Sequence, residues 1–405
     1  MKHIIVGNGV AGVTAAQSII RADPTAKVHV FGEEPYPYYR RPLLWEFIAG
    51  QIEQDELYFR PADWYAERGI HLHMGIRATA LVPLEHRLTL SDGTMMTYDR
   101  LLLATGGRPL VPPCEGTDKQ GVFTLRTLED ALAIKAYAQR VSTAVVIGGG
   151  LLGLETARAL RTAGLDVTVV EFVPYLLPRQ LDAEGAQVLE SLLEAQGLRI
   201  ITGGVTKAVR GNERADCVWL QDDRVVPGEL VIFSTGIRPE VTLAQAAGLQ
   251  VNRGITVDEQ LQTSAENVLA AGDAAEFEGR VYGIIPPAIE QARVAAANMV
   301  APGSATYTGT LPATTLKVAG AELTSLGEST VDTDETVQLR HTDFAAGHYR
   351  KFVLREGRIV GAILLNDKEH VRPVTQLIEQ GVDVSANAAH LLDDNFDLRS
   401  LLQAR

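Results

Sequence analysis

Residues 3–12 read His3-Ile4-Ile5-Val6-Gly7-Asn8-Gly9-Val10-Ala11-Gly12, and this stretch decides the fold of the chain. Its first four residues are short, largely apolar and β-branched, which predicts a buried strand. The G-x-G-x-x-G pattern of residues 7–12 follows, and then come helical character over 13–20 and a second strand at 28–31. A glycine pattern that follows a strand and opens a helix indicates a βαβ unit that binds a dinucleotide.

The three glycines of this pattern have separate physical roles. One makes the tight turn, one lets the backbone approach a pyrophosphate, and one lets the helix and the strand pack closely. The helix N-terminus then offers free N–H groups and a partial positive charge to the phosphates. A carboxylate after the second strand is placed to accept ribose hydroxyls. The residues assigned to this first site are Gly7, Gly9, Val10, Ala11, Gly12, Glu33 and Glu34.

The same unit occurs a second time. Residues 144–147 predict a strand, 148–153 repeat the glycine pattern, 154–163 predict a helix, and 167–170 predict a strand that ends at Glu171. Two complete fingerprints imply two dinucleotide sites, whereas a dehydrogenase with one nicotinamide cofactor needs only one. A flavin that receives hydride from a nicotinamide needs both. The residues assigned to the second site are Gly148, Gly150, Leu151, Leu152, Gly153 and Glu171.

Glu171 also predicts which nicotinamide cofactor is used. A carboxylate at the end of this strand can accept both ribose hydroxyls of NADH, and it would repel the additional phosphate of NADPH. No arginine follows directly, because Phe172-Val173-Pro174 comes next and Arg179 lies beyond the strand end. The sequence therefore predicts a preference for NADH.

The composition is that of a globular chain with more than one domain. The 405 residues exceed what one hydrophobic core usually supports, which predicts two or three domains. The formal net charge of −13 argues against a nucleic-acid partner, since phosphate binding needs clustered Lys and Arg. No apolar run approaches the ~18 residues of a membrane span, and the N-terminus does not resemble a targeting signal. We expect a cytoplasmic protein with no membrane span.

Cys114 and Cys217 are the only cysteines of the sequence. Two widely spaced thiols form neither a disulfide framework nor a metal site, so no metal is expected. Both cysteines are interpreted as packing residues.

Three further motifs complete a resemblance to a known family. Residues 103–109 (LATGGRP) and 234–239 (STGIRP) each close a nucleotide-binding unit, and residues 268–273 read VLAAGD. With the two fingerprints, these motifs resemble those of the FAD- and NAD(P)-dependent pyridine nucleotide-disulfide oxidoreductase superfamily over nearly the whole chain. The resemblance implies that Asp273 reaches a ribityl hydroxyl of FAD. It adds to the cofactor contacts Ala78, Ala104, Thr105, Gly106 and Gly236.

The resemblance also implies the architecture, an α/β fold with two Rossmann-like dinucleotide-binding domains and a small α+β C-terminal domain. The FAD-binding domain is expected to be discontinuous, with the NADH-binding domain inserted into it, and the C-terminal domain covers the flavin and often forms a dimer interface in relatives. We therefore expect a monomer or a homodimer. The implied limits are 1–112 and 241–304 for the FAD-binding domain, 113–240 for the NADH-binding domain, 305–381 for the C-terminal domain and 382–405 for an acidic tail.

Two local patterns are predicted in the C-terminal part. Segments 349–354 and 358–365 flank Glu356-Gly357, which indicates a β-hairpin. A short helix is expected at 398–402, near Asp393-Asp394 of the tail. Neither pattern assigns a function to the tail.

Residues 37–45 (PYYRRPLLW) lack the thiol that disulfide reductases of this superfamily carry in that segment. Thiol–disulfide exchange needs a thiolate beside the flavin, so a disulfide reductase of the usual kind is excluded. The segment is instead similar to a cysteine-free branch. That branch contains NADH:rubredoxin reductases, ferredoxin reductases of oxygenase systems, apoptosis-inducing-factor-like proteins and the flavin portion of NADH-dependent nitrite reductase.

Glu155 and Arg41 are the candidate catalytic residues. In relatives, a Glu two residues beyond the second fingerprint points toward the nicotinamide and pairs with a cation near flavin N5. Arg41 is the first candidate for this cation and Arg40 the second, and both are assigned to the FAD site. The alternatives are an exposed helix Glu and a solvated basic pair.

The resemblance predicts two further features. Glu290, Gln291 and Ala292 are expected to begin a helix after residues 285–287, and the N-terminus of that helix would face the flavin pyrimidine. Lys317 matches a recurrent lysine of the C-terminal domain, whose role stays open.

The implied activity is an FAD-dependent NADH oxidoreductase. Noncovalently bound FAD takes hydride from NADH at N5 and passes electrons to an acceptor such as rubredoxin, ferredoxin, a nitrite-reducing component or a small quinone. Two alternatives stay open: an NADH oxidase that reduces oxygen directly, and a redox-sensing interaction protein similar to apoptosis-inducing factor. The basic run Arg350-Lys351, Arg355 and Arg358 is interpreted as a docking surface for an acidic carrier, with a solvated hairpin edge as the alternative.

Overall fold

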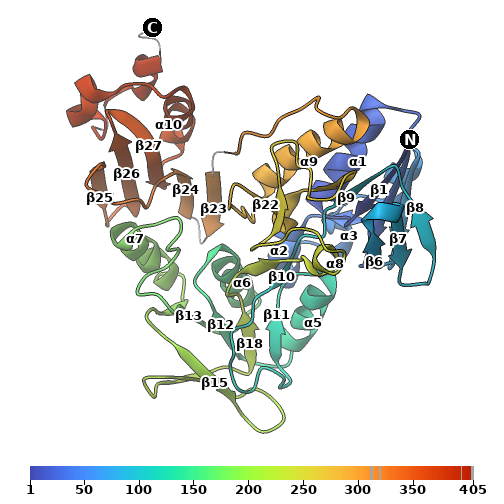
Figure 1. The fold of residues 1–405 in the computed structure, drawn as a ribbon. Coiled ribbons are helices and arrows are strands. Elements are labelled where there is room, and N and C mark those ends of the chain that lie inside the picture. The colour runs from blue at the N-terminus through green and yellow to red at the C-terminus, as the bar shows by residue number, and fades with distance from the viewer. Residues whose placement is uncertain (311–312, 319–320, 394, 403–405) are drawn as a thin grey trace. The chain divides into compact units, whose positions relative to one another are not determined.

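The computed structural model describes residues 1–310, 313–318, 321–393 and 395–402. The chain folds into two compact units (Figure 1). The first unit contains Met1–Leu44, Ile52–Pro109 and Ile237–Thr310, and the second contains Trp45–Gln51, Leu110–Gly236 and the described residues after 310. The finer division into the four expected segments stays a prediction.

The first unit is built on a five-stranded parallel sheet of order β21-β9-β1-β2-β5. Helices α1 and α9 pack side by side in this unit (Figure 1). The strands are β1 (Lys2–Val6), β2 (Lys27–Gly32), β5 (Ile70–Met74), β9 (Arg100–Leu103) and β21 (Val268–Ala270), and the helices are α1 (Val10–Ala22) and α9 (Ile285–Val300).

The strand order explains where this unit can hold a ligand. After β1 the chain first adds β2 on one side of it and later β9 on the other. The carboxyl end of β1 is therefore a topological switch point, where open α/β sheets bind their ligands. The apolar residues of the central strands β1 and β9 are buried, as parallel sheets covered on both faces require. Ile4, Ile5, Leu101, Leu102 and Leu103 are each 0% exposed.

The second unit repeats this arrangement in a sheet of order β11-β18-β12-β13-β14, again with all strands parallel. Helix α6 (Leu151–Thr162) follows β12, as α1 follows β1 in the first unit. The strands are β11 (Val122–Thr124), β12 (Thr143–Ile147), β13 (Asp166–Val170), β14 (Arg199–Ile201) and β18 (Leu230–Phe233). Both predicted βαβ units are therefore confirmed.

Most of the remaining elements of the two nucleotide-binding parts are short, and the exceptions are helices α5 and α7. They include two three-stranded antiparallel sheets, β6-β7-β8 and β15-β16-β17, one in each unit. The elements are β3 (Tyr38–Tyr39), η1 (Arg41–Leu43), α2 (Leu44–Ile48), α3 (Gln54–Leu57), β4 (Tyr58–Arg60), α4 (Ala62–Ala66), β6 (Ala78–Val82), η2 (Pro83–Glu85), β7 (Arg87–Leu90), β8 (Met95–Thr97), β10 (Gly107–Pro109), α5 (Leu128–Ala138), α7 (Ala183–Glu194), β15 (Thr206–Arg210), β16 (Cys217–Leu220), β17 (Val225–Pro227), β19 (Ile237–Pro239), α8 (Thr242–Ala246), β20 (Ile255–Val257), η3 (Gly272–Ala274) and β22 (Ala275–Phe277).

The C-terminal part of the second unit is an antiparallel sheet of order β23-β24-β27-β26-β25, with helix α10 packed on β27 and β24. The predicted hairpin is confirmed, because β26 and β27 pair on either side of Glu356-Gly357, and both of these residues have positive φ angles (48° and 72°), as a type I′ turn requires. The elements are β23 (Ala313–Val318), β24 (Ala321–Gly327), β25 (Val337–Asp343), β26 (His348–Arg355), β27 (Arg358–Leu365), α10 (Lys368–Gln380), η4 (Ser385–His390) and η5 (Leu398–Leu402).

Residues 382–393 and 395–402 do not extend away from this sheet. Val384, Leu391 and Leu398 are buried in the same hydrophobic cluster as Val374 and Leu377 of α10. The short helix expected at 398–402 is present as the 3-10 helix η5, and Asp394 lies outside the described residues. The described part of the acidic tail therefore packs in the C-terminal core.

The structure confirms the predicted fold class, two Rossmann-like units with a small α+β C-terminal domain. Across the part of the chain that the structure describes, none of the helices is both long and apolar enough to cross a membrane.

Candidate functional site

The first fingerprint closes the turn between β1 and α1 as its glycines require. Gly7 has a φ of 119°, and a Cβ there would collide with the carbonyl oxygen of Ala104. Gly12 packs against the carbonyl of Gly7 in the same way. Gly9 is the N-cap of α1 and carries no side chain that could occupy the first N–H groups of the helix. These N–H groups are therefore free to bind an anion, which fits the pyrophosphate of FAD.

Residues far apart in the sequence meet at this turn. A Cβ on Gly272 would lie 3.0 Å from the Cβ of Ala11 and 3.7 Å from that of Ala288, so the 3-10 turn η3 lies beside the starts of both α1 and α9. The Gly272 N–H donates a 2.9 Å hydrogen bond to the buried side chain of Gln291. Asp273, the expected ribityl contact, is on this turn and half-buried. The geometry thus gathers the parts that an FAD site needs.

Helix α9 begins earlier than the sequence predicted. It starts at Ile285, and Pro286 and Pro287 occupy its first turn, where proline fits because an N–H is not needed and φ is already suitable. Glu290, Gln291 and Ala292 therefore lie in the second turn, and the expectation that they begin the helix is wrong. Glu290 is exposed and accepts a hydrogen bond from Thr310, whereas Gln291 and Ala292 are buried.

Glu34 and Arg41 form an ion pair next to the first fingerprint. The Glu34 carboxylate accepts hydrogen bonds from the Tyr39 hydroxyl and from Arg41, each at 2.5 Å. An Arg41 nitrogen lies 3.4 Å from where a Cβ on Gly9 would stand. Burial alone would lower the pKa of the Arg41 guanidinium. The neighbouring Tyr39 and Glu34 have a larger opposite effect, so the pKa is raised. Arg41 is therefore a permanent cation beside the proposed pyrophosphate position.

The two adjacent carboxylates, Glu33 and Glu34, have different surroundings, and so do the two adjacent arginines. Glu33 is exposed and makes no side-chain hydrogen bond within the described residues, whereas Glu34 holds Arg41. Arg40 is exposed, and its guanidinium lies 5.0 Å from the centroid of the Phe59 ring. Glu33 and Arg41 are thus the members of each pair that suit a ribose and a phosphate.

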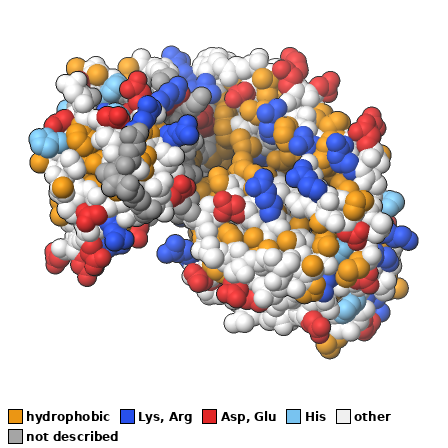
Figure 2. Space-filling model, turned by 90° about the horizontal axis from the view of Figure 1, so that it is seen from above, with side chains coloured by type: hydrophobic (Ala, Val, Ile, Leu, Met, Phe, Trp, Pro, Cys, Tyr) orange, Lys and Arg blue, Asp and Glu red, His pale blue; other side chains and the backbone are white. Residues whose placement is uncertain are grey.

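On the face seen in Figure 2, Lys and Arg side chains lie among hydrophobic and acidic ones.

Two residues that the sequence did not single out support this turn. The buried Tyr65 donates a 2.7 Å hydrogen bond from its hydroxyl to the side chain of Asn8 inside the fingerprint. Tyr39 is 4% exposed and holds Glu34. Asn8 places a polar amide within the glycine turn, and this was the feature of the sequence that could have predicted a hydrogen-bond partner for it. The aromatic residues themselves gave no sign of which polar group they would meet.

The motif that closes the first unit also lies where expected. Ala104 follows β9, and its N–H bonds to the carbonyl of Val6 at the end of β1. The Thr105 hydroxyl donates to the carbonyl of Glu240 at 2.6 Å, and Gly106 has a φ of 75°. Ala78 begins β6, and its side chain packs against the core of the first unit. In the second unit, Gly236 has a φ of 105° and open space beside its Cα.

The second fingerprint repeats the geometry of the first. Gly148 has a φ of 118°, and a Cβ there would collide with the carbonyl oxygen of Ser234. Gly150 is the N-cap of α6, and no heavy atom lies within 4 Å of a Cβ built on it. Gly153 packs tightly on Gly148, while Leu151 and Leu152 form the first turn of α6. The open space at the helix start fits the pyrophosphate of a second dinucleotide.

Glu171 lies directly at this second turn. Its carboxylate accepts hydrogen bonds from the N–H groups of Gly149 at 2.5 Å and Val173 at 3.0 Å. The carboxylate is therefore fixed at the end of β13, next to the fingerprint, where the ribose of a nicotinamide cofactor would lie.

Glu155 is buried in the second turn of α6. It is 6% exposed, and Arg158, one helix turn on, pairs with it at 3.4 Å. Burial raises the pKa of the Glu155 carboxyl to about 7, against the opposing effect of Arg158. The alternative of an exposed helix Glu is therefore wrong, and the pairing of Glu155 with Arg41 stays a prediction.

The cysteines lie outside the first unit. Cys114 and Cys217 are free and half-buried, and burial raises the pKa of both thiols. Neither environment favours a thiolate, which supports their interpretation as packing residues. Within the described residues, no group of three or more His, Cys, Asp or Glu side chains is arranged to hold a metal ion.

The basic run of the C-terminal hairpin is not a free docking surface. Arg350 pairs with Asp367 at 2.5 Å, Lys351 with Asp182 at 3.0 Å, and Arg355 with a Glu328 oxygen at 2.6 Å. Lys351 is only 1% exposed, so the solvated-edge alternative does not describe it either. The docking interpretation does not hold for Arg350, Lys351 and Arg355, because carboxylates from other segments pair with these three side chains. For the exposed Arg358 it stays a prediction. The backbone of Lys317 belongs to β23, but its side chain lies outside the described part of the chain.

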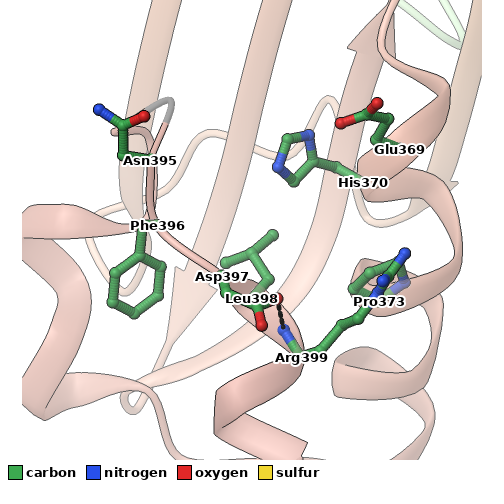
Figure 3. A pocket seen from close by; sticks show the side chains of 8 residues that line it. All are labelled: Glu369, His370, Pro373, Asn395, Phe396, Asp397, Leu398 and Arg399. Atoms are coloured by element: carbon green, nitrogen blue, oxygen red, sulfur yellow. Dashed lines mark hydrogen bonds between the residues drawn. The ribbon is translucent and has the colours of Figure 1, made fainter.

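A shallow pocket of about 230 Å³ lies between α10 and residues 395–399 (Figure 3). His370 contributes to it and bonds through a ring nitrogen to Asp367 at 2.6 Å. The N–H of Arg399 bonds to Asp397 at 3.0 Å. None of the predicted cofactor-binding residues lines this pocket, which belongs to the packing of the C-terminal segment.

Two glycine-capped helices on two parallel sheets define a reductase that binds two dinucleotides. The chain belongs to the pyridine nucleotide-disulphide oxidoreductase family, whose model matches residues 1–298 and whose members are FAD-dependent NAD(P)H oxidoreductases. The model of the rubredoxin NAD+ reductase C-terminal domain matches residues 312–382. The resemblance inferred from the sequence is thereby confirmed.

The chain is similar to several curated proteins. It is 36% identical over 384 residues to the NAD(P)H nitrite reductase of Bacillus subtilis, a match that covers 94% of this chain and 48% of that protein. It is also 36% identical over 307 residues to a putidaredoxin reductase of Pseudomonas putida, covering 73% of each. The chain spans about half the length of the nitrite reductases that it matches.

Solved structures show the same fold. A covalent putidaredoxin reductase–putidaredoxin complex matches with a TM-score of 0.89 and 29% identity, covering 100% of this chain and 98% of that one. The NADH:rubredoxin oxidoreductase of Clostridium acetobutylicum matches with a TM-score of 0.80 and 27% identity, covering 99% of both chains.

Proposed function

We propose that this chain is an FAD-dependent NADH oxidoreductase that passes electrons to a redox partner such as rubredoxin, ferredoxin or a nitrite-reducing component. The observation that carries the proposal is the pair of glycine-capped helices, each at the switch point of its own parallel sheet. The segment 37–45 contains no cysteine, so electrons have no thiol to pass through after the flavin.

The first unit is proposed to hold FAD without a covalent bond. The start of α1 would bind the pyrophosphate, Glu33 the adenosine ribose and Asp273 a ribityl hydroxyl. Arg41, fixed by Glu34, adds positive charge next to Gly9. When bound, FAD would supply the chemistry of accepting hydride from NADH at N5 and releasing electrons singly or as a pair. Precipitation with acid should release all of the flavin into the supernatant.

The second unit is proposed to hold NADH. The start of α6 would bind its pyrophosphate, and Glu171 is fixed where it can accept ribose hydroxyls. Glu155 is proposed to face the nicotinamide and to pair with Arg41 in the loaded enzyme. Its raised pKa means that this carboxyl gains or loses its proton near neutral pH.

The acceptor class is proposed from the relatives. Their names include a putidaredoxin reductase, a chlorobenzene dioxygenase ferredoxin reductase component and nitrite reductases. The test is anaerobic reduction of the FAD-loaded protein by NADH, followed by measured reoxidation rates with rubredoxin, ferredoxin, a nitrite-reducing component and a small quinone. Absence of flavin bleaching by NADH would contradict the proposed activity.

A second candidate is an NADH oxidase. The chain is 33% identical over 317 residues to an NADH oxidase of Methanocaldococcus jannaschii, a match that covers 70% of that protein. Rapid oxygen uptake with NADH and no added partner would favour this function. A long-lived complex of reduced protein with NAD and slow turnover would instead favour a redox-sensing interaction protein. We propose the cytoplasm as the compartment, since both cysteines are free thiols.

A further inference from the structure

A loop of the second unit closes directly over the second fingerprint. Residues 172–181 connect Glu171 to helix α7. The Leu177 N–H bonds to the carbonyl of Gly149 at 3.1 Å, and the Leu176 side chain comes within 2.6 Å of where a Cβ on Gly149 would stand. Leu177 is 0% exposed and has a φ of 52°, a left-handed conformation that a leucine adopts only when its surroundings impose it. The loop is thus fixed against the glycine turn by a hydrogen bond and by side-chain packing.

The far end of this loop is anchored by the C-terminal sheet. Asp182 is the N-cap of α7, and its carboxylate accepts a 3.0 Å hydrogen bond from the Gly185 N–H of its own helix. It also accepts a 2.7 Å hydrogen bond from the Tyr349 hydroxyl and pairs with the Lys351 ammonium at 3.0 Å. Tyr349 and Lys351 both belong to β26, which contacts α7 (Figure 1). The first turn of α7 is therefore bonded to a strand 167 residues further along the chain.

The contact is buried and tightly packed. Tyr349 and Lys351 are each 1% exposed. A Cβ on Gly185 would lie 2.7 Å from the Tyr349 ring, so the ring rests on the backbone of α7. Arg340 of β25 lies 3.4 Å from Asp182, and Thr342 donates a 2.6 Å hydrogen bond to Glu184. A buried ammonium is stable only when it is paired, so the Lys351 side chain needs the Asp182 carboxylate as its partner, and Lys351 in turn fixes the position of that carboxylate.

We propose that Tyr349 and Lys351 are positioning residues for the NADH site, because they hold Asp182 and thereby keep loop 172–181 closed on the second fingerprint. The proposal rests on the proposed binding of NADH at that fingerprint. One end of the loop is fixed at Glu171, and the other is fixed at Asp182 by the C-terminal domain. If the second end is freed, NADH binding must also order the loop, and this entropy cost weakens affinity without changing the reacting groups.

The test measures steady-state kinetics with NADH and ferricyanide, and equilibrium binding of NAD+, for Lys351→Met and Tyr349→Phe. We expect KM for NADH and Kd for NAD+ to rise by about tenfold in Lys351→Met, equivalent to about 1.4 kcal/mol, while kcat stays within about twofold. Tyr349→Phe removes only the hydroxyl hydrogen bond, so its effect should have the same sign and be smaller. Lys351→Arg, which keeps the charge, should restore most of the affinity.

The matched control is Arg355→Met. Arg355 lies on the same strand and also pairs with a carboxylate, but its partner is Glu328 rather than a residue at the start of α7. Its KM for NADH should stay at the wild-type value. If Lys351→Met does not fold with full FAD content, the Tyr349→Phe variant decides. Unchanged KM and Kd in a folded, FAD-loaded variant would overturn the proposal, whereas a wild-type protein that NADH does not reduce would instead overturn the proposed function.

Discussion

Replacement of Glu171 is the sharpest test of the second site. The carboxylate is fixed by the N–H groups of Gly149 and Val173, so it cannot move away from a cofactor that binds at this turn. A 2′-phosphate at ~4 Å from it would be repelled by about 4 kcal/mol at an effective dielectric near 20. Glu171 is only partly buried, so solvent screening reduces this repulsion to roughly 2–3 kcal/mol. Such an energy corresponds to a preference for NADH on the order of a hundredfold.

The assay is steady-state kcat/KM with NADH and with NADPH, using ferricyanide as acceptor. Wild type should prefer NADH by about a hundredfold, and Glu171→Ala should reduce this ratio by at least about tenfold. Glu194→Gln is the matched control, because it removes an exposed carboxylate of the same unit at the end of α7. The reasoning is refuted if wild type uses NADPH within about threefold of NADH, or if Glu171→Ala leaves the ratio unchanged.

Three other predictions follow from burial. The double variant Cys114→Ser, Cys217→Ser should keep NADH-dependent dye reduction within about tenfold of wild type, and a larger loss in a folded, FAD-loaded sample would contradict a thiol-free pathway. The Glu155 carboxyl has its pKa raised from 4.5 to about 7, so its contribution to stability is present below pH 4.5 and is lost as pH rises through about 7. Glu155→Gln should therefore be more stable than wild type at pH 8 but not at pH 4.5. Equal differences in urea midpoint at both pH values would contradict this prediction. Burial lowers the pKa of His3 from 6.5 to about 4, so its contribution is present above pH 6.5 and is lost as pH falls through about 4; His3→Phe should lose less stability than wild type between these pH values, as urea unfolding would show.

The features that the sequence predicted correctly are those that the backbone alone imposes. Both fingerprints need a glycine after the strand, because φ is positive there and a Cβ would meet the carbonyl of the residue that follows a neighbouring strand. The hairpin at Glu356-Gly357 needs two residues with positive φ in the same way. Such requirements involve only a few consecutive residues, so a pattern of residue types is enough to reveal them.

The features that could not be predicted from the sequence depend on which side chain from a distant segment contacts a given residue. Arg350 and Lys351 are consecutive basic residues, yet one meets Asp367 after β27 and the other meets Asp182 at the start of α7. The chain has 50 acidic against 37 basic side chains, so partners for a basic run are abundant. A run of positive charge in such a sequence therefore does not establish a positive surface. The start of α9 was missed for a local reason, since the helix was expected only after residues 285–287, whereas the two prolines lie in its first turn.

The pair Glu33 and Glu34 shows how the structure completes an assignment that residue types leave open. Both follow β2, and either carboxylate could accept ribose hydroxyls. The Glu34 carboxylate accepts hydrogen bonds from Tyr39 and Arg41, and its charge is compensated by the Arg41 cation, so a ribose would have to compete with an ion pair. Glu33 is exposed and without a hydrogen-bond partner among the described side chains, so a ribose would meet no such competition. The two neighbours therefore have different surroundings: Glu34 pairs with the arginine beside the proposed phosphate position, and Glu33 is open to the proposed ribose.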